Sequence, residues 1–189
     1  TGKHLFKING SEKARIESDG DTFINGGVNH TTTAGNTNLQ VLTTNGQGAN
    51  LGGSIGLGGV YHATNQITFA EIHGKKENGT TANLSGYMAF VTRSATDNAQ
   101  ERMRLYSSGN LLVGKTALDN STVGIRMNST GDASFVANGN RALVLNRKTS
   151  DGDIALFLKD GTTVGSIGTA ATDIYIGTTD TGIRFNDAV

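Results

Sequence analysis

Residues 109–116, with the sequence GNLLVGKT, match the pattern of a phosphate-binding loop letter for letter. Such a loop wraps phosphates with successive backbone N–H groups, and a helix must begin at its lysine so that the positive helix end faces the anion. Here the apolar run 111–113 favours a strand, and no amphipathic helix pattern follows Lys115 and Thr116. We therefore expect a β-hairpin at this position and not a nucleotide site.

Other residues with ligand or nucleophile chemistry are scattered. The Asp-Gly-Asp sequences at 19–21 and 151–153 could offer oxygens to Ca²⁺, but neither has the ligand spacing of a calcium loop, so ordinary turns are the better interpretation. The four histidines lack the close pairing of a zinc site, although an ion held by one histidine from each of three chains stays open as an alternative. There is no cysteine and no nucleophile motif, so we predict no metal, no cofactor and no catalytic residue.

Residues 56–59, GLGG, resemble part of a dinucleotide-binding fingerprint. A helix would have to begin directly after them, and residues 60–65 give no helix start. Glycines in such a position are typical of a strand edge or a β-bulge, which is what we expect here.

A repeated ten-residue pattern predicts the elements that position these side chains. Its copies begin at Arg15, Arg104 and Arg126, and each continues with an apolar residue, a spacer, serine, a second spacer, glycine, and Asp or Asn. The glycine supplies the positive φ that a hairpin turn or its bulge requires. Apolar residues alternate with polar ones before the turn, as in a strand with one buried face. Because the copies are unequally spaced, we interpret them as a reused hairpin and not as a solenoid of fixed period.

The composition favours an all-β protein with many chain reversals. The 189 residues include 27 glycines and no Pro, Cys or Trp, and only 35% are hydrophobic and 6% aromatic. A single chain of this kind has little material for a core, and burial between chains would relieve that shortage. The formal net charge is zero without charge runs, which argues against a nucleic-acid partner, and no apolar stretch is long enough for a membrane-spanning helix.

We expect three regions: an N-terminal β shaft segment at 1–45, a Gly-rich antiparallel β module at 46–116, and a C-terminal β shaft of short strands at 117–189. A polar connection is expected at 28–36. Outside the hairpin copies, strands are predicted at 4–8, 39–44, 54–61, 66–73, 86–92, 142–146, 154–159, 163–167, 173–176 and 182–185.

The segment 101–116, ERMRLYSSGNLLVGKT, resembles a segment that recurs in the distal tail-fibre proteins of tailed bacteriophages. Further similar strings follow the same order along the chain, whereas residues 1–45 match only through the hairpin unit. The resemblance implies an elongated fibre of short strands, an intertwined parallel homotrimer about a threefold axis, and a place in the distal tail of the virion after assembly in the host cytoplasm. A self-cleaving chaperone often follows such segments, so we expect a fragment of a longer protein. Besides 101–116, the segments that resemble tail-fibre sequences are 48–59, 69–78, 86–93 and 176–187.

The resemblance further implies a structural and host-adhesion component, not an enzyme, that binds a bacterial surface receptor through several identical sites. We expect this receptor to be a glycan. Its partners would be its own copies and other tail proteins, without membrane insertion. If exposed, Tyr61, His62, Tyr87 and Arg93 are candidate receptor contacts; the alternative is that the tyrosines pack the sheet. Two other functions stay open, namely a tailspike enzyme that depolymerises host polysaccharide and a purely structural shaft.

Overall fold

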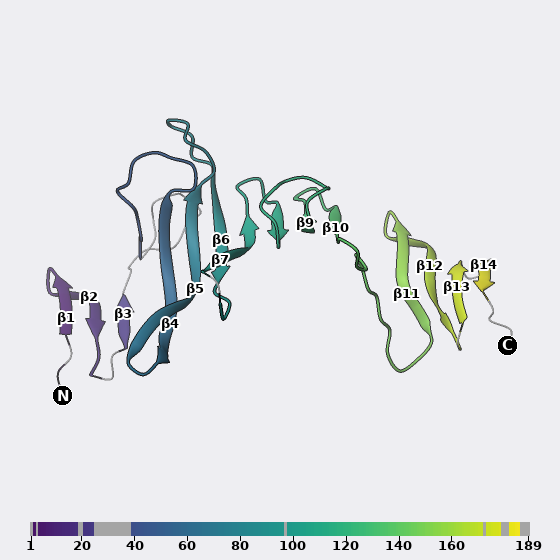
Figure 1. Ribbon diagram of the computed structural model, residues 1–189, viewed down its shortest axis with the longest axis horizontal. Coiled ribbons are helices and arrows are strands. Elements are labelled where there is room, and N and C mark those ends of the chain that lie inside the picture. Colours follow the sequence, from purple (N-terminus) through teal and green to yellow (C-terminus); the bar gives the residue numbers. More distant parts are fainter. Residues whose placement is uncertain are drawn as a thin grey trace. The chain divides into compact units, whose positions relative to one another are not determined.

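A computed structural model describes residues 2, 4–18, 21–24, 39–96, 98–171, 173–178 and 182–185, and every regular element in them is a β-strand. The strands form three antiparallel sheets in which each strand pairs with its neighbour in sequence (Figure 1). The prediction of an all-β chain is thus confirmed for the described residues. The chain divides into two compact units, Thr1–Ser134 and Phe135–Val189, and each is described by itself.

The first sheet contains β1 (His4–Ile8), β2 (Ser11–Ile16) and β3 (Thr22–Ile24). Asn9 and Gly10 join β1 to β2 with φ angles of 50° and 78°, which is the two-residue turn that suits the twist of a hairpin. Strands β2 and β3 are the predicted hairpin that begins at Arg15. The Arg15 guanidinium lies 4.0 Å from the ring centre of Phe23, its partner across the ladder.

The second sheet is a meander of seven strands in the order β10-β9-β8-β7-β6-β5-β4, so β4 is an edge strand. The glycines at 56–59 lie within β4, and the β4–β5 register shifts between Leu57 and Gly58, so the predicted strand edge with a bulge is confirmed. The strands are β4 (Gly52–His62), β5 (Asn65–Lys76), β6 (Gly86–Thr92), β7 (Gln100–Leu105), β8 (Leu111–Val113), β9 (Gly124–Met127) and β10 (Ala133–Val136).

The hairpin copies at 104–113 and 126–135 have the same turn. In the first, the Tyr106 N–H donates to the Asn110 carbonyl at 3.0 Å, and the N–H of Gly109, with φ of 82°, donates to the Tyr106 carbonyl at 2.9 Å. This is a type I turn closed by a left-handed glycine, which makes a three-residue hairpin loop. The second copy repeats both bonds, from Asn128 to Asp132 at 2.8 Å and from Gly131 to Asn128 at 3.0 Å. The predicted hairpin unit is therefore confirmed in these copies.

One face of the seven-stranded sheet is apolar across six strands. The register sets Ile72 beside Ile55 on one side and Phe90 on the other, and this row continues through β7, β8 and β9. Although apolar, several side chains of this face are open, among them Ile55 at 46% and Met88 at 45% exposed, and the others are partly exposed. We call the following residues the apolar face: Ile55, Leu57, Ile72, Met88, Phe90, Met103, Leu105, Leu111, Val113, Ile125 and Met127.

The opposite face, which we call the polar face, contains the buried residues of this sheet. Ala89 and Leu112 are each 0% exposed, and they lie in one row with Arg104. Two hydrogen bonds, at 2.6 and 2.8 Å, tie the Arg104 guanidinium to Glu101 on the same strand. Long charged side chains can cover apolar neighbours with their stems while their heads stay in water. The polar face is thus closed by its own side chains, whereas the apolar face is open.

The sheet of the second unit has the same division between its faces. It consists of β11 (Gly152–Lys159), β12 (Thr162–Ala170), β13 (Asp173–Gly177) and β14 (Gly182–Phe185) in chain order. Ser166 and Asp173 are 9% and 5% exposed on one face. The other face presents apolar side chains that are 45–65% exposed, among them Phe157, Ile174, Ile176, Ile183 and Phe185.

The strands predicted at 39–44 and 142–146 are wrong, because neither segment is part of a ladder. Their alternating pattern is that of a strand, but a strand also requires a partner, which the pattern does not supply. At the first segment, a Cβ on Gly53 would lie 1.8 Å from the Val41 carbonyl oxygen, so the chain passes close to β4 without pairing. The connection predicted at 28–36, and His30 in it, lie outside the described residues.

Candidate functional site

A pocket of about 460 Å³ lies where β4 turns into β5. Tyr61, near the end of β4, and Arg93, directly after β6, both line it. The Arg93 N–H donates to the Phe69 carbonyl at 3.0 Å, so the backbone at Arg93 stays hydrogen-bonded to β5 beyond the end of β6. The lining residues are Tyr61, Ile67, Phe69, Arg93, Ser94, Ala95, Thr96 and Asn98.

The pocket combines two open aromatic rings with one cation. Tyr61 is 59% exposed and Phe69 is 45% exposed, and Gly59 leaves room for the Phe69 ring, which is 3.5 Å from where a Cβ would stand. The Nε–H of Arg93 donates to the Thr68 carbonyl at 3.3 Å, which steadies the guanidinium. No carboxylate among the described residues forms an ion pair with Arg93. The pocket can therefore offer apolar ring faces together with hydrogen-bond donors on a positive charge.

The structure brings together two of the four residues predicted as receptor contacts. Tyr61 and Arg93 share the pocket, and His62 is exposed beside it with its ring centre 6.4 Å from that of Tyr61. Tyr87 is only 4% exposed and is not available as a contact. For Tyr87 the alternative holds, namely that the side chain packs against the sheet.

Tyr87 packs among polar partners on the polar face. Its hydroxyl donates to Asn50 Oδ1 at 2.8 Å, and the Arg104 guanidinium lies 3.9 Å from its ring centre. Tyr106 lies against it with ring centres 6.0 Å apart. Burial raises the pKa of the Tyr87 hydroxyl, because removal from water disfavours the phenolate. These contacts connect the segment before β4 to the middle of the sheet.

Sequence reasoning missed Phe69, Thr96 and Asn98 as pocket residues. Phe69 has no partner in the β4–β5 ladder, where the register shifts between Leu57 and Gly58, so the period-two pattern of β5 does not assign its face. The sequence indicates a bulge among these glycines, but it does not fix the residue at which the register shifts.

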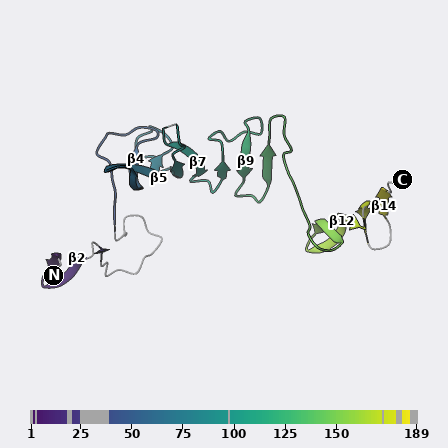
Figure 2. The same ribbon diagram turned by 60° about the horizontal axis from the view of Figure 1, so that its bottom comes forward.

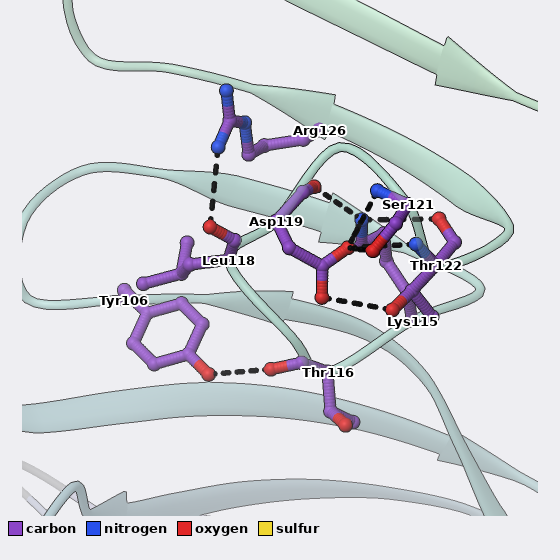
Figure 3. A network of polar contacts seen from close by, with 8 residues as sticks. All are labelled: Tyr106, Lys115, Thr116, Leu118, Asp119, Ser121, Thr122 and Arg126. Atoms are coloured by element: carbon purple, nitrogen blue, oxygen red, sulfur yellow. Dashed lines mark hydrogen bonds and ion pairs between the residues drawn. The ribbon is translucent and has the colours of Figure 1, made fainter.

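Lys115, the lysine of the phosphate-loop match, is enclosed by its own loop (Figure 3). Its side chain is 1% exposed, and Nζ donates to the carbonyls of Asp119 and Thr122 at 2.6 and 3.1 Å. An ion pair of 3.3 Å to Asp119 Oδ1 completes the set. Residues 111–113 form a strand, and residues 116–123 contain no helix. The geometry required for wrapping phosphates is absent from residues 109–116, and the predicted hairpin is present.

Asp119 organises the loop that covers Lys115. Its carboxylate accepts hydrogen bonds from the N–H groups of Thr122 and Ser121 at 2.7 and 2.9 Å, and from the Thr122 hydroxyl at 2.8 Å. Led by the Thr122 N–H, these donors favour the charged form and hold the pKa of Asp119 well below its ordinary value. The loop is also bound to the sheet, because Tyr106 donates to the Thr116 carbonyl at 2.7 Å and Arg126 to the Leu118 carbonyl at 3.2 Å (Figure 3).

Asp119→Asn is expected to weaken the dependence of stability on acid. A carboxylate with a lowered pKa in the folded state stabilises the protein fully above its ordinary value of 3.8, and that contribution is lost as the pH falls below it. Urea unfolding near pH 6 and near pH 2.5 should show a smaller loss of stability on acidification in the variant than in the wild type. The matched control is Asp160→Asn in the exposed β11–β12 turn. If wild type and Asp119→Asn lose the same stability on acidification, the lowered pKa of Asp119 does not stabilise the fold.

The Asp-Gly-Asp sequence at 151–153 is an ordinary structural turn. Asp151 Oδ2 accepts the Ala171 N–H at 2.6 Å, and Asp153 accepts the Tyr175 hydroxyl. Both carboxylates are thus used to connect β11 to its neighbours. No group of three or more potential metal ligands gathers in the described ranges. The other such sequence, at 19–21, lies partly outside them.

Comparisons with protein-family models, with curated proteins and with solved structures give no match for this sequence. None of the elements in the described part of the chain is a helix able to cross a membrane. Function is therefore argued from the arrangement of the residues and from the resemblance of their sequence.

Proposed function

We propose that this chain is a structural and host-adhesion part of a bacteriophage tail fibre, that it assembles as a parallel homotrimer in the distal tail of the virion, and that it is not an enzyme. The apolar face supports this proposal most directly. The strings that resemble tail fibres, 69–78, 86–93 and 101–116, form most of strands β5 to β8, which carry the middle of that face.

The size of the apolar face argues for burial against other copies. Monomeric proteins rarely expose a contiguous apolar patch above a few hundred Å², whereas this face extends over six strands. Its side chains are 37% exposed at Ile72 and 56% exposed at Leu57. Only part of the face is covered within the described residues, where Leu39 and Val41 line a pocket with Ile55, Ile72 and Met88. Strands β4, β5 and β7 lie in a single layer (Figure 2). Closed homo-oligomers bring identical surfaces together around an axis, which gives every copy the cover that it lacks alone.

The pocket supports the adhesive part of the proposal. Tyr61, Phe69 and Arg93 line it together, and both aromatic rings are open to solvent. A trimer would present three such pockets, and simultaneous binding at identical sites raises avidity without any tighter single contact. The receptor in this proposal is a glycan of the bacterial surface, and other tail proteins would hold the fibre in place.

Mass photometry tests the assembly. The expected mass is three times the 19.7 kDa of one chain, and a stable monomer would contradict the proposal. Adhesion is tested separately, by binding of fluorescently labelled protein to a panel of bacterial strains and their isolated surface polysaccharides. Binding without release of oligosaccharide is expected; released oligosaccharide would support the tailspike enzyme instead.

A further inference from the structure

We propose that the pocket formed by Tyr61, Phe69 and Arg93 binds a pyranose sugar that carries a carboxylate, within a glycan of the bacterial surface. This inference rests on the proposed adhesive function and deepens it by naming the chemical class of the ligand. The residues line one cavity, where β4 turns into β5.

The aromatic side chains are placed for a sugar ring. Tyr61 and Phe69 are 59% and 45% exposed and line the same pocket. A pocket of about 460 Å³ with an apolar lining and a few convergent polar groups is in the usual range for small-molecule sites. One face of a pyranose presents C–H groups, which pack on aromatic rings, while its hydroxyls require hydrogen-bond partners. The pocket therefore fits a ring that is apolar on one side and polar at its edge.

Arg93 selects for a carboxylate on that ring. The guanidinium fork matches a carboxylate with two parallel hydrogen bonds, and charge-assisted bonds of this kind are about twice as strong as neutral ones. Its Nε–H is already used on the Thr68 carbonyl, which fixes the side chain while its terminal nitrogens make no hydrogen bond to any described residue. Thr96 and Asn98 add groups that can bind hydroxyls; Asp97, between them, lies outside the described residues.

A single cation favours a carboxylate over a phosphate. Arg93 is the one basic residue among the described residues that line the pocket. Phosphate groups carry more charge and are usually bound by several cations or by a helix N-terminus, and no helix occurs in the described ranges.

Saturation-transfer NMR with the whole chain tests the proposal. The probes are the methyl glycosides of glucuronic and galacturonic acid and 2-keto-3-deoxyoctonate, and methyl glucoside is the neutral counterpart. We expect saturation transfer from the protein to at least one acidic probe, with affinity for the neutral sugar lower by about tenfold or more. Equal transfer to acidic and neutral probes, or transfer to none of the acidic ones, would overturn the proposal.

Three variants locate the site. Arg93→Gln and Tyr61→Ala are each expected to weaken binding of the acidic probe by about tenfold or more. The control is Arg102→Gln, because Arg102 is an exposed arginine whose Nε–H also makes one hydrogen bond, to Thr92 Oγ1 at 3.2 Å. Tyr61 is 59% exposed, so Tyr61→Ala should fold even if Arg93→Gln does not. Wild-type binding in both pocket variants would place the site elsewhere.

Adsorption to bacteria tests the adhesive function separately from the assignment of the pocket as the receptor site. If wild-type protein adsorbs to a strain of the panel and Arg93→Gln adsorbs equally well, the adhesive function stands and the pocket is not the receptor site. If wild-type protein adsorbs to no strain and to no isolated polysaccharide, the adhesive function itself fails. If Arg93→Gln and Tyr61→Ala lose adsorption and Arg102→Gln adsorbs like the wild type, the result supports the adhesive function and also the pocket as the receptor site.

Discussion

Lys115→Met is expected to lower the free energy of unfolding by about 2–4 kcal/mol. The substitution leaves the Asp119 and Thr122 carbonyls without their donor and Asp119 without its cation. Removing one member of a buried ion pair usually costs about 3–5 kcal/mol, and the figure is reduced here because the Asp119 side chain is 40% exposed. Methionine has nearly the length of lysine, so the loss reports the missing charge and hydrogen bonds and not a cavity.

Denaturant unfolding followed by circular dichroism measures this loss. The matched control is Lys148→Met, at an exposed lysine of the second unit, which should change stability by less than about 0.5 kcal/mol. The same experiment decides between the two interpretations of residues 109–116. If Lys115 served a phosphate, the variant would lose ATP binding and keep its stability; we expect no ATP binding in either protein and a clear loss of stability in the variant.

Ile72→Asp is expected to abolish assembly at micromolar concentration. Ile72 lies in the row between Ile55 and Phe90, one strand in from the β4 edge of the apolar face. In a covered face each chain would bury a carboxylate without a partner, which costs several kcal/mol per copy. The cost is repeated in every copy of a symmetric assembly. Mass photometry should therefore show dissociated chains or aggregates for this variant, in place of the trimer that we propose for the wild type.

The control for this experiment is Ser54→Asp. Ser54 is exposed on the polar face, one residue from Ile55 in β4, and its partner across the ladder is His73. The same carboxylate is thus introduced on the same part of the sheet but toward solvent and a basic group. Ser54→Asp should assemble like the wild type. If Ile72→Asp also keeps the wild-type mass, the apolar face is not the surface that joins the copies.

Much of the fold could be predicted from local sequence. Turn chemistry identified the hairpins at 104–113 and 126–135, because glycine and asparagine decide the backbone at a reversal almost alone. The segments 39–44 and 142–146 were mispredicted because a strand also depends on a partner that lies elsewhere in the chain. The alternation of apolar and polar residues likewise predicted strands with two different faces. It did not indicate that the polar face would contain the buried residues.

The site was less predictable than the fold. Tyr61 and Arg93 were chosen for their chemistry and do share a pocket, whereas Tyr87 has the same chemistry and is buried. The difference arises from Asn50 and Arg104, which reach Tyr87 from the loop before β4 and from β7. Such contacts depend on the register of several strands at once, and the register depends on a bulge that the sequence does not fix to one residue.

The pairing of every strand with its neighbour in sequence has a consequence for how the chain folds. Each ladder closes only a short loop, so little chain entropy opposes its formation and the sheets can form early and locally. Covering the apolar face is a different kind of event, because in the proposed assembly it requires encounters between molecules. Folding then separates into a fast step that is independent of protein concentration and a slower association step of second or higher order. A change in protein concentration acts on the association step alone.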